Sequence, residues 1–308
     1  MEQSVEAKLK EFDVEGYTQG VRRRDRLFEI AGLIATLFVL TFLFAVSVDL
    51  LIDGWIRLKE PSFYTSFPSR FPDQAGILSA WVGTLYVMAG ALFWAIVLGI
   101  PAGIYLEEYG GKGKIARIIE VNISNLAAVP SIVYGLLALG VFVYRFKFGE
   151  SVLTAGLTLG LLMLPVVVVS TRESIRRIPR SIREAAYALG ATRWETLVHH
   201  ILPYSLGGIL TGLIIGASRA IGETAPLITV GALTFIAFLP PAPWEDFIEM
   251  LKSPFTVLPI QMFNWVSRPQ EEFHYNAAAA GFVLLVLAFL MNSIAFYIRF
   301  KVRRKYQW

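Results

Sequence analysis

Long apolar runs alternate with short polar connections along most of this chain. There are six such runs, at 30–48, 75–106, 121–144, 151–171, 201–244 and 275–298. Five of them contain no charged residue, and 201–244 contains two. A helix needs about 20 residues to cross the roughly 30 Å of hydrocarbon in a bilayer. The pattern therefore predicts an all-α membrane protein with six transmembrane helices.

The segments that flank these runs predict the remaining organisation. The first run follows a mostly polar stretch and lacks the small-residue cleavage site of a signal peptide, so we expect it to remain as a membrane anchor. The prediction is a polar arm at 1–27, a six-helix domain at 28–298 with its core at 75–298, and a basic tail at 299–308.

The amino-acid composition supports a membrane protein and excludes several kinds of functional site. The chain is 55% hydrophobic and 17% charged, and its mean hydropathy is +0.57, which is typical of a membrane protein rather than a soluble one. It has no cysteine, which excludes disulfides, iron–sulfur clusters and thiolate catalysis. Function must rest on other groups.

Lysine and arginine are distributed unevenly between the two sets of connections. The arm, the tail and the connections at 107–120 and 172–200 carry twenty of them, whereas the three connections on the opposite side carry seven. The positive-inside rule then places both termini and the loop at 172–203 in the cytoplasm of a multi-pass inner-membrane protein. The net charge of +4 comes from the same clusters, so it indicates topology rather than nucleic-acid binding.

The polar segment at 181–203 carries local helix signals. Ser181 and Glu184 form a capping-box pattern, which predicts a helix from about residue 182. Gly190 suits the left-handed position after a helix end. Thr192 and Glu195 form a second box that predicts another helix start. On spacing alone, an ordinary surface loop with two capped turns explains the segment equally well.

The same segment resembles the EAA loop of ATP-binding-cassette importer permeases. The matching positions are Glu184, Ala185, Ala186, Gly190, Leu202 and Pro203, and His200 stands where the family pattern has isoleucine. In that family the loop is a coupling helix that sits in a groove of the cytoplasmic ATPase subunit. The resemblance therefore implies that this segment transmits ATP-driven movement to the membrane helices.

Three further stretches are similar to the PstA-type permease subunits of phosphate importers: VPSIVYGLLALG at 129–140, GETAPLITVGA at 222–232 and SPFTVLPIQMFNWVSRPQEEF at 253–273. The likeness is collinear from about 75 to 298. It implies the MetI-like fold of type I importer permeases and phosphate as the substrate. The implied partners are a second, PstC-like permease, a PstB-like ATPase dimer and an external PstS-like phosphate-binding protein.

The chain shows no catalytic signature of its own. A phosphate-cradling P-loop needs Gly, four residues and then Gly-Lys-Ser/Thr, and the run from Gly111 to Lys114 lacks both the spacing and the hydroxyl. His199 and His200 are adjacent, so they point to different faces of a helix and predict no metal site. We expect a transport subunit that is not an enzyme, needs no cofactor and relies on a separate ATPase.

Candidate pathway residues lie in and beside the apolar runs. Arg219 and Glu223 are four residues apart and would share a helical face next to Thr224. A charge inside a membrane is costly, so the two form either a packing ion pair or a phosphate contact. Arg172 and Glu173, at the end of the fourth run, are candidates for a cytoplasmic exit.

Pro226 is expected to kink the fifth helix, because proline removes a backbone hydrogen bond. Two other functions stay open at this point. One is a permease for another oxyanion, such as sulfate or molybdate. The other is an ion-coupled secondary transporter that works alone, against which the EAA pattern argues.

Overall fold

The computed structural model describes residues 14–110 and 113–305, and within these ranges the chain is helical with no strand. The chain divides into two compact units, Met1–Ile52 and Asp53–Trp308. The α-helices are α2 (Val14–Leu58), α3 (Pro61–Thr65), α4 (Leu78–Trp94), α5 (Ile100–Ile104), α6 (Lys114–Leu126), α7 (Ser131–Ala138), α8 (Val152–Arg176), α9 (Arg180–Ala188), α10 (Arg193–Thr196), α11 (Leu202–Ala220), α12 (Ala225–Thr229), α13 (Phe247–Lys252), α14 (Leu258–Val266) and α15 (Glu272–Lys305).

Several α-helices continue into one another through short π-helical turns. Ala95–Gly99 joins α4 to α5, and Leu197–Ile201 joins α10 to α11. Two more π-helical segments, Tyr105–Tyr109 and Leu139–Arg145, extend α5 and α7. These continuations produce the long helices Leu78–Tyr109 and Arg193–Ala220 and the shorter helix Ser131–Arg145.

In the first unit, the described residues form most of helix α2. Its large apolar side chains are exposed, Phe28 and Phe38 among them. An apolar helix of this length is long enough to span a bilayer.

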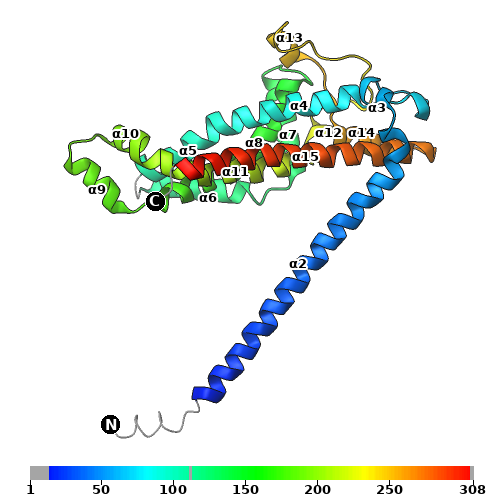
Figure 1. The fold of residues 1–308 in the computed structure, drawn as a ribbon. Helices are drawn as coiled ribbons and strands as arrows, with labels where there is room; N and C mark the ends of the chain where they lie inside the picture. The colour runs from blue at the N-terminus through cyan, green and yellow to red at the C-terminus, as the bar shows by residue number, and fades with distance from the viewer. Residues whose placement is uncertain (1–13, 111–112, 306–308) are drawn as a thin grey trace, which may run out of the picture. The chain divides into compact units, whose positions relative to one another are not determined.

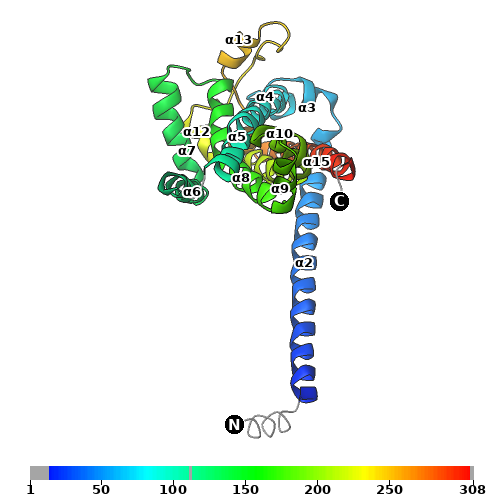
Figure 2. The same ribbon diagram turned by 90° about the vertical axis from the view of Figure 1, so that its left-hand side faces the viewer.

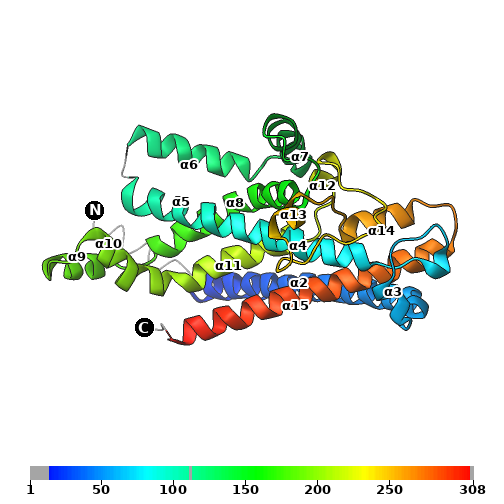
Figure 3. The same ribbon diagram turned by 90° about the horizontal axis from the view of Figure 1, so that it is seen from above.

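In the second unit, α4, α8, α11 and α15 run side by side as a bundle (Figures 1 and 3). Helix α8 packs closely against both α4 and α11. The approach to α4 depends on Gly90 and Gly156, because a Cβ on Gly156 would lie 3.2 Å from the Cα of Gly90. Small residues at such crossings let helix backbones approach closely in membrane proteins.

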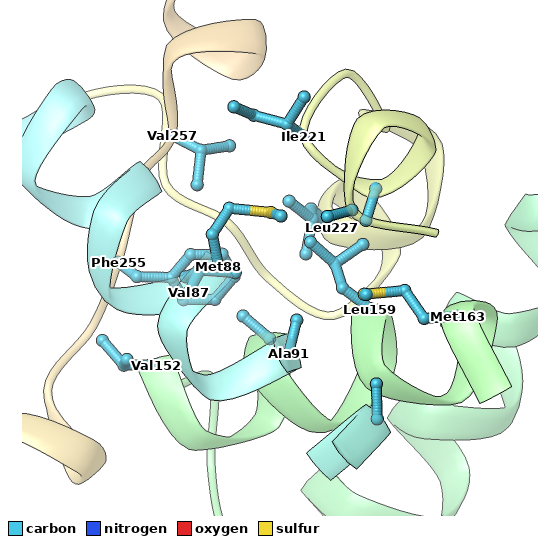
Figure 4. Packing of buried hydrophobic residues seen from close by; sticks show 14 of the residues in the cluster. Val87, Met88, Ala91, Val152, Leu159, Met163, Ile221, Leu227, Phe255 and Val257 are labelled. Atoms are coloured by element: carbon cyan, nitrogen blue, oxygen red, sulfur yellow. The ribbon is translucent and has the colours of Figure 1, made fainter. Parts of the chain in front are cut away.

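Apolar side chains fill the centre of this bundle (Figure 4). Val87 and Met88 of α4 meet Leu159 and Met163 of α8, and Leu227 of α12 joins them. In lipid, the gain comes from close packing rather than from removing apolar surface from water. This core fixes the position of the chain that follows α11.

Five helices in the described residues are long and apolar enough to cross a membrane: Val21–Leu58, Leu78–Tyr109, Val152–Arg176, Arg193–Ala220 and Glu272–Lys305. They include the first, second, fourth and sixth predicted spans and the beginning of the fifth. The prediction of an all-α membrane protein is confirmed.

The predicted third span, 121–144, is not one continuous helix. Helix α6 ends at Leu126 and α7 begins at Ser131, after Pro130. Proline disfavours a helical conformation in the residue before it, which separates the two helices. The apolar helix that remains, Ser131–Arg145, is shorter than the five long ones.

The predicted fifth span, 201–244, also ends early. Helix α11 stops at Ala220, and Pro226 lies in the first turn of the separate helix α12. The expected kink at Pro226 is therefore wrong: proline suits a first turn because no helical partner is needed for its missing N–H. Gly231, with φ of +88°, then turns the chain into an irregular segment before α13.

The two ends of the bundle carry different elements. Helices α9 and α10 and the final turns of α15 lie at one end, and α3 and α14 lie at the other (Figure 1). Figure 2 looks along the bundle with α9 and α10 in front. The segment that resembles an EAA loop therefore forms a tip at one end of the helices.

Candidate functional site

The tip between α8 and α11 is shaped by two backbone motifs around Gly190. The N–H of Gly190 donates to the carbonyl of Tyr187 at 2.9 Å, and that of Ala191 donates to the carbonyl of Ala186 at 3.0 Å. This pair of bonds is the Schellman motif, and Gly190 holds the left-handed conformation it needs, with φ of +88°. The prediction for Gly190 is confirmed.

The predicted capping box at Thr192 is confirmed. The Glu195 N–H donates to the Thr192 hydroxyl oxygen at 3.3 Å, and the Thr192 N–H donates to the Glu195 carboxylate at 2.8 Å. The predicted box at Ser181 and Glu184 is wrong. Helix α9 begins earlier, at Arg180, with Pro179 as its cap residue and no side-chain hydrogen bond there.

The tip exposes large apolar side chains. Leu189 is 90% exposed and Trp194 is 65% exposed, and Tyr187 is exposed beside them. Among the residues of the EAA pattern, Glu184 and Ala185 are also exposed, whereas Ala186 faces inward and is buried. Leu202 and Pro203 are half-buried in the first turn of α11. Exposed apolar groups gathered on one element are typical of a docking surface.

Helix α9 is anchored to the bundle by Arg183. Its guanidinium lies 2.6 Å from the carboxylate of Glu108 and donates to the carbonyls of Ile178 and Ile175 at 2.9 and 3.2 Å. Both charged side chains are mostly buried, with 16% and 13% exposed. A charge-assisted contact with several hydrogen bonds holds a helix more firmly than an exposed ion pair does.

Arg172 belongs to a neighbouring set of ion pairs. Its guanidinium lies 3.0 Å from Glu120 of α6 and 3.7 Å from Glu107. Arg176 lies 3.0 Å from the same Glu107 carboxylate and 3.3 Å from Glu173. The hydrogen bond from Arg172 holds the pKa of the Glu120 carboxyl below its usual value. These pairs join α6, α8 and the end of the second span.

Arg172 and Glu173, which were predicted together as an exit, are connected through Glu107 and Arg176 rather than directly. Arg172 is 12% exposed, whereas Glu173 is 48% exposed and also lines a pocket. Sequence reasoning missed the roles of Glu107, Glu108 and Arg183. Their oppositely charged partners in other helices lie 65 to 75 residues away along the chain, so local spacing carries no signal for them.

Arg219 and Glu223 lie at the break after α11. Their charged groups are 3.5 Å apart, with 43% and 19% of the side chains exposed. Arg219 lies in the last turn of α11, whereas Glu223 and Thr224 follow the end of that helix. The ion pair between Arg219 and Glu223 therefore spans the turn after α11 and does not lie along one continuous helix. Thr224 is half-buried and precedes α12, where its carbonyl accepts from the Ile228 N–H at 3.0 Å. The structure thus brings all three together.

Helix α7 packs against α12, the short helix that follows this break. A Cβ on Gly135 would collide with Thr229 and with the backbone of Pro226. Glycine at this position lets α7 approach α12 at backbone distance. The short third helix is therefore packed against the element directly after Glu223 and Thr224.

No group of three or more metal-binding side chains occurs in the part of the chain that the structure describes. His199 and His200 both lie exposed in the π-helical turn before α11. The ring of His199 contacts the carbonyl of Glu195 at 3.0 Å.

Comparison with known proteins identifies the family. Residues 99–304 match the model for "Binding-protein-dependent transport system inner membrane component". The chain is 31% identical to phosphate transport system permease protein PstA 1 of Mycobacterium tuberculosis (strain CDC 1551 / Oshkosh) over 82% of this chain and 81% of that one. It is 31% identical to PstA of Mycobacterium leprae over 92% of both chains.

Solved structures agree on the fold. A chain from the MetNI methionine ABC transporter in an inward-facing conformation matches with a TM-score of 0.54 at 18% identity, covering 73% of this chain and 94% of that one. The predicted MetI-like fold is confirmed.

Proposed function

The chain belongs to the family of inner membrane components of binding-protein-dependent transport systems, and from that premise we propose that it is a permease subunit of an ATP-driven importer of inorganic phosphate. It is a multi-pass membrane protein and a transport component rather than an enzyme. The observation that carries the phosphate assignment is its similarity, along most of both chains, to permeases named for phosphate transport.

Helices α9 and α10 are the coupling element in this proposal. The exposed side chains of Leu189, Trp194 and Tyr187 would fill a groove of an ATPase subunit, since aromatic and apolar anchors dominate such interfaces. Arg183 and Glu108 would pass the movement of α9 to the end of the second span. The PstB-like ATPase is a dimer, and a PstC-like permease completes the membrane part.

The anion pathway is assigned to the break after α11. Arg219 is 43% exposed within this chain, so its guanidinium is accessible to an anion or to the second permease. A guanidinium suits phosphate because its planar N–H groups match two phosphate oxygens at once. Glu223 and Thr224 would hold or release the arginine as the helices move.

Orientation follows from the positive charges. Both termini and the tip at 172–203 are placed in the cytoplasm, and the segment at 245–274 faces a PstS-like phosphate-binding protein outside. Arg172 and Glu173 then lie at the cytoplasmic ends of the helices.

The proposal is tested by reconstituting the complex isolated from its own cells in proteoliposomes. With ATP and the external binding protein, phosphate uptake should be rapid, and excess unlabelled sulfate or molybdate should not compete. Competition by either oxyanion would contradict the assignment of phosphate as the specific substrate. Uptake that needs an ion gradient but no ATP would overturn the transport class and favour a secondary transporter.

A further inference from the structure

A pocket of about 640 Å³ lies between α8, α11 and α15. Its lining includes Ser170 and Ser174 of α8, Arg177 directly after that helix, and Arg299 and Arg303 of α15. The transport mechanism above assigns no role to these residues. The volume is within the range of pockets that bind small molecules.

Three arginines give the pocket a strong positive charge. No ion pair joins Arg177, Arg299 or Arg303 to another residue in the described part of the chain. The acidic lining residue, Glu173, already has Arg176 at 3.3 Å. The guanidinium of Arg299 lies over the ring of Phe296, 5.9 Å from its centroid, a contact that leaves its N–H groups able to donate. Guanidinium groups that have no ion-pair partner and line one cavity are suited to an anion with several oxygens.

The serine and threonine hydroxyl groups of the pocket already donate to the backbone. Ser170, Ser174 and Thr211 donate to backbone carbonyls of their own helices at 2.7, 2.6 and 2.8 Å. The guanidinium groups therefore supply the donors for an anion. This favours a phosphate group, which accepts bidentate hydrogen bonds from arginine, over a neutral polyol that would need hydroxyl partners.

The wall of α11 leaves room for a ligand. Gly207 and Gly208 both line the pocket, but they differ in what surrounds them. A Cβ on Gly208 would collide with Ser174, whereas a Cβ on Gly207 would meet nothing within 4 Å. Gly208 is therefore required for packing, and Gly207 borders the open space of the pocket.

We propose that this pocket binds a phosphate group at the membrane surface, carried by an anionic phospholipid or present as inorganic phosphate. The pocket is formed by the ends of α8 and α15 and the beginning of α11, next to the basic end of the chain (Figure 1). Basic pockets between membrane helices on the cytoplasmic side are suited to anionic headgroups. The cytoplasmic position of the pocket rests on the proposed function, whereas its affinity for a phosphate group is argued from the three arginines alone.

The test uses the complete complex purified from its own membranes. Native mass spectrometry counts bound phosphatidylglycerol, with phosphatidylcholine as the zwitterionic comparison, and calorimetry measures inorganic phosphate. Replacing Arg299→Gln together with Arg303→Gln should weaken binding of one probe about tenfold or more. The matched control is Lys301→Gln with Arg304→Gln, which removes equal charge from the same exposed turns outside the pocket.

Loss of phosphatidylglycerol in the pocket variant but not in the control assigns the site to a lipid headgroup. Loss of inorganic phosphate alone assigns it to the free ion. Equal losses in both variants, or no binding to the unaltered complex, would overturn the proposal. If the variant with both arginines replaced fails to assemble, the test uses Gly207→Leu, which keeps every charge and fills the open space of the pocket. Binding of the probe should then be weakened. Unchanged binding in Gly207→Leu would also overturn it.

Discussion

Gly190 shapes the tip between α8 and α11 through its backbone conformation. Its φ is +88°, and a Cβ there would meet nothing within 4 Å, so the cost of a side chain is conformational rather than steric. We expect Gly190→Val to strain the turn by roughly 1–2 kcal/mol. Phosphate uptake should fall while ATP hydrolysis continues and the helices stay inserted.

The control at this position is Gly190→Asn, since asparagine tolerates the left-handed conformation much better than valine. Uptake and ATPase activity of both variants would be measured on the same reconstituted complex. Normal coupling in Gly190→Val would contradict the assignment of this turn to energy transfer.

Arg219 and Glu223 pose a second question at the residue scale, because their 3.5 Å contact fits both a structural pair and an anion site. If the pair is only structural, the double change Arg219→Gln with Glu223→Gln should be milder than either single change, since a lone charge in an apolar setting costs more than a neutral pair. If Arg219 meets phosphate, uptake should be lost in the single and the double variant alike.

We expect the second outcome, with the complex still assembled and still hydrolysing ATP. Arg219→Lys should keep some uptake, but less than arginine, because lysine lacks the bidentate fork. Near-normal uptake by the double variant would leave the pair with a packing role alone.

Residues with local signals were predictable from the sequence, and those with distant partners were not. Gly190 and the Thr192 box depend on neighbours within a few residues, so their spacing predicted them. The Ser181 pattern failed because Pro179 starts the helix two residues earlier than the box requires. Arg183 and Glu108 meet only through the packing of separate helices, which no local pattern records.

At the scale of elements, the contact between Arg183 and Glu108 joins α9 to the end of the second span, which would let the two move together. We expect Arg183→Gln to leave Glu108 without its charged partner, at a cost of about 1–3 kcal/mol. Uptake per ATP hydrolysed should fall several-fold. The matched control is Arg180→Gln, which removes an exposed charge from the same helix, where no ion pair is found among the described residues.

Both variants would be compared for assembly by copurification of the ATPase and for transport in proteoliposomes. Equal effects of Arg183→Gln and Arg180→Gln would mean that general charge, rather than this contact, supports coupling.

Apolar runs predicted where helices exist but not where they break. The breaks after Leu126 and Ala220 occur inside uncharged or nearly uncharged sequence, so hydropathy stays high across them. Pro130 and Pro226 are the residues that mark the new helix starts. Hydropathy measures partition into lipid, whereas a break depends on backbone hydrogen bonding, and a proline is compatible with either a kink or a new helix.

At the scale of the whole molecule, the number of crossings decides where the two termini lie. Among the residues that the structure describes, five helices are long enough to span, and the sixth candidate, Ser131–Arg145, is shorter. Its 15 residues correspond to roughly 22 Å at 1.5 Å per residue, less than the hydrocarbon thickness. Six crossings put the termini on the same side, whereas five put them on opposite sides. The sequence supports six, because positive charge gathers at both ends of the chain.

We therefore expect reporters fused at the N-terminus and after Arg304 to be cytoplasmic, and one fused after Lys252 to be extracytoplasmic. Alkaline phosphatase, active only outside, and a fluorescent protein, fluorescent only inside, give opposite signals at each position. The fusions after Lys252 and Arg304 differ by one crossing, α15, so finding them on the same side would contradict its role as a span. The N-terminal fusion and the fusion after Arg304 can also lie on opposite sides of the membrane while α15 still crosses it. That result would mean that Ser131–Arg145 does not cross, and that one terminus does not follow the positive-inside rule. The same-side result instead requires the short helix to cross, and a helix shorter than the hydrocarbon is accommodated by local thinning of the bilayer.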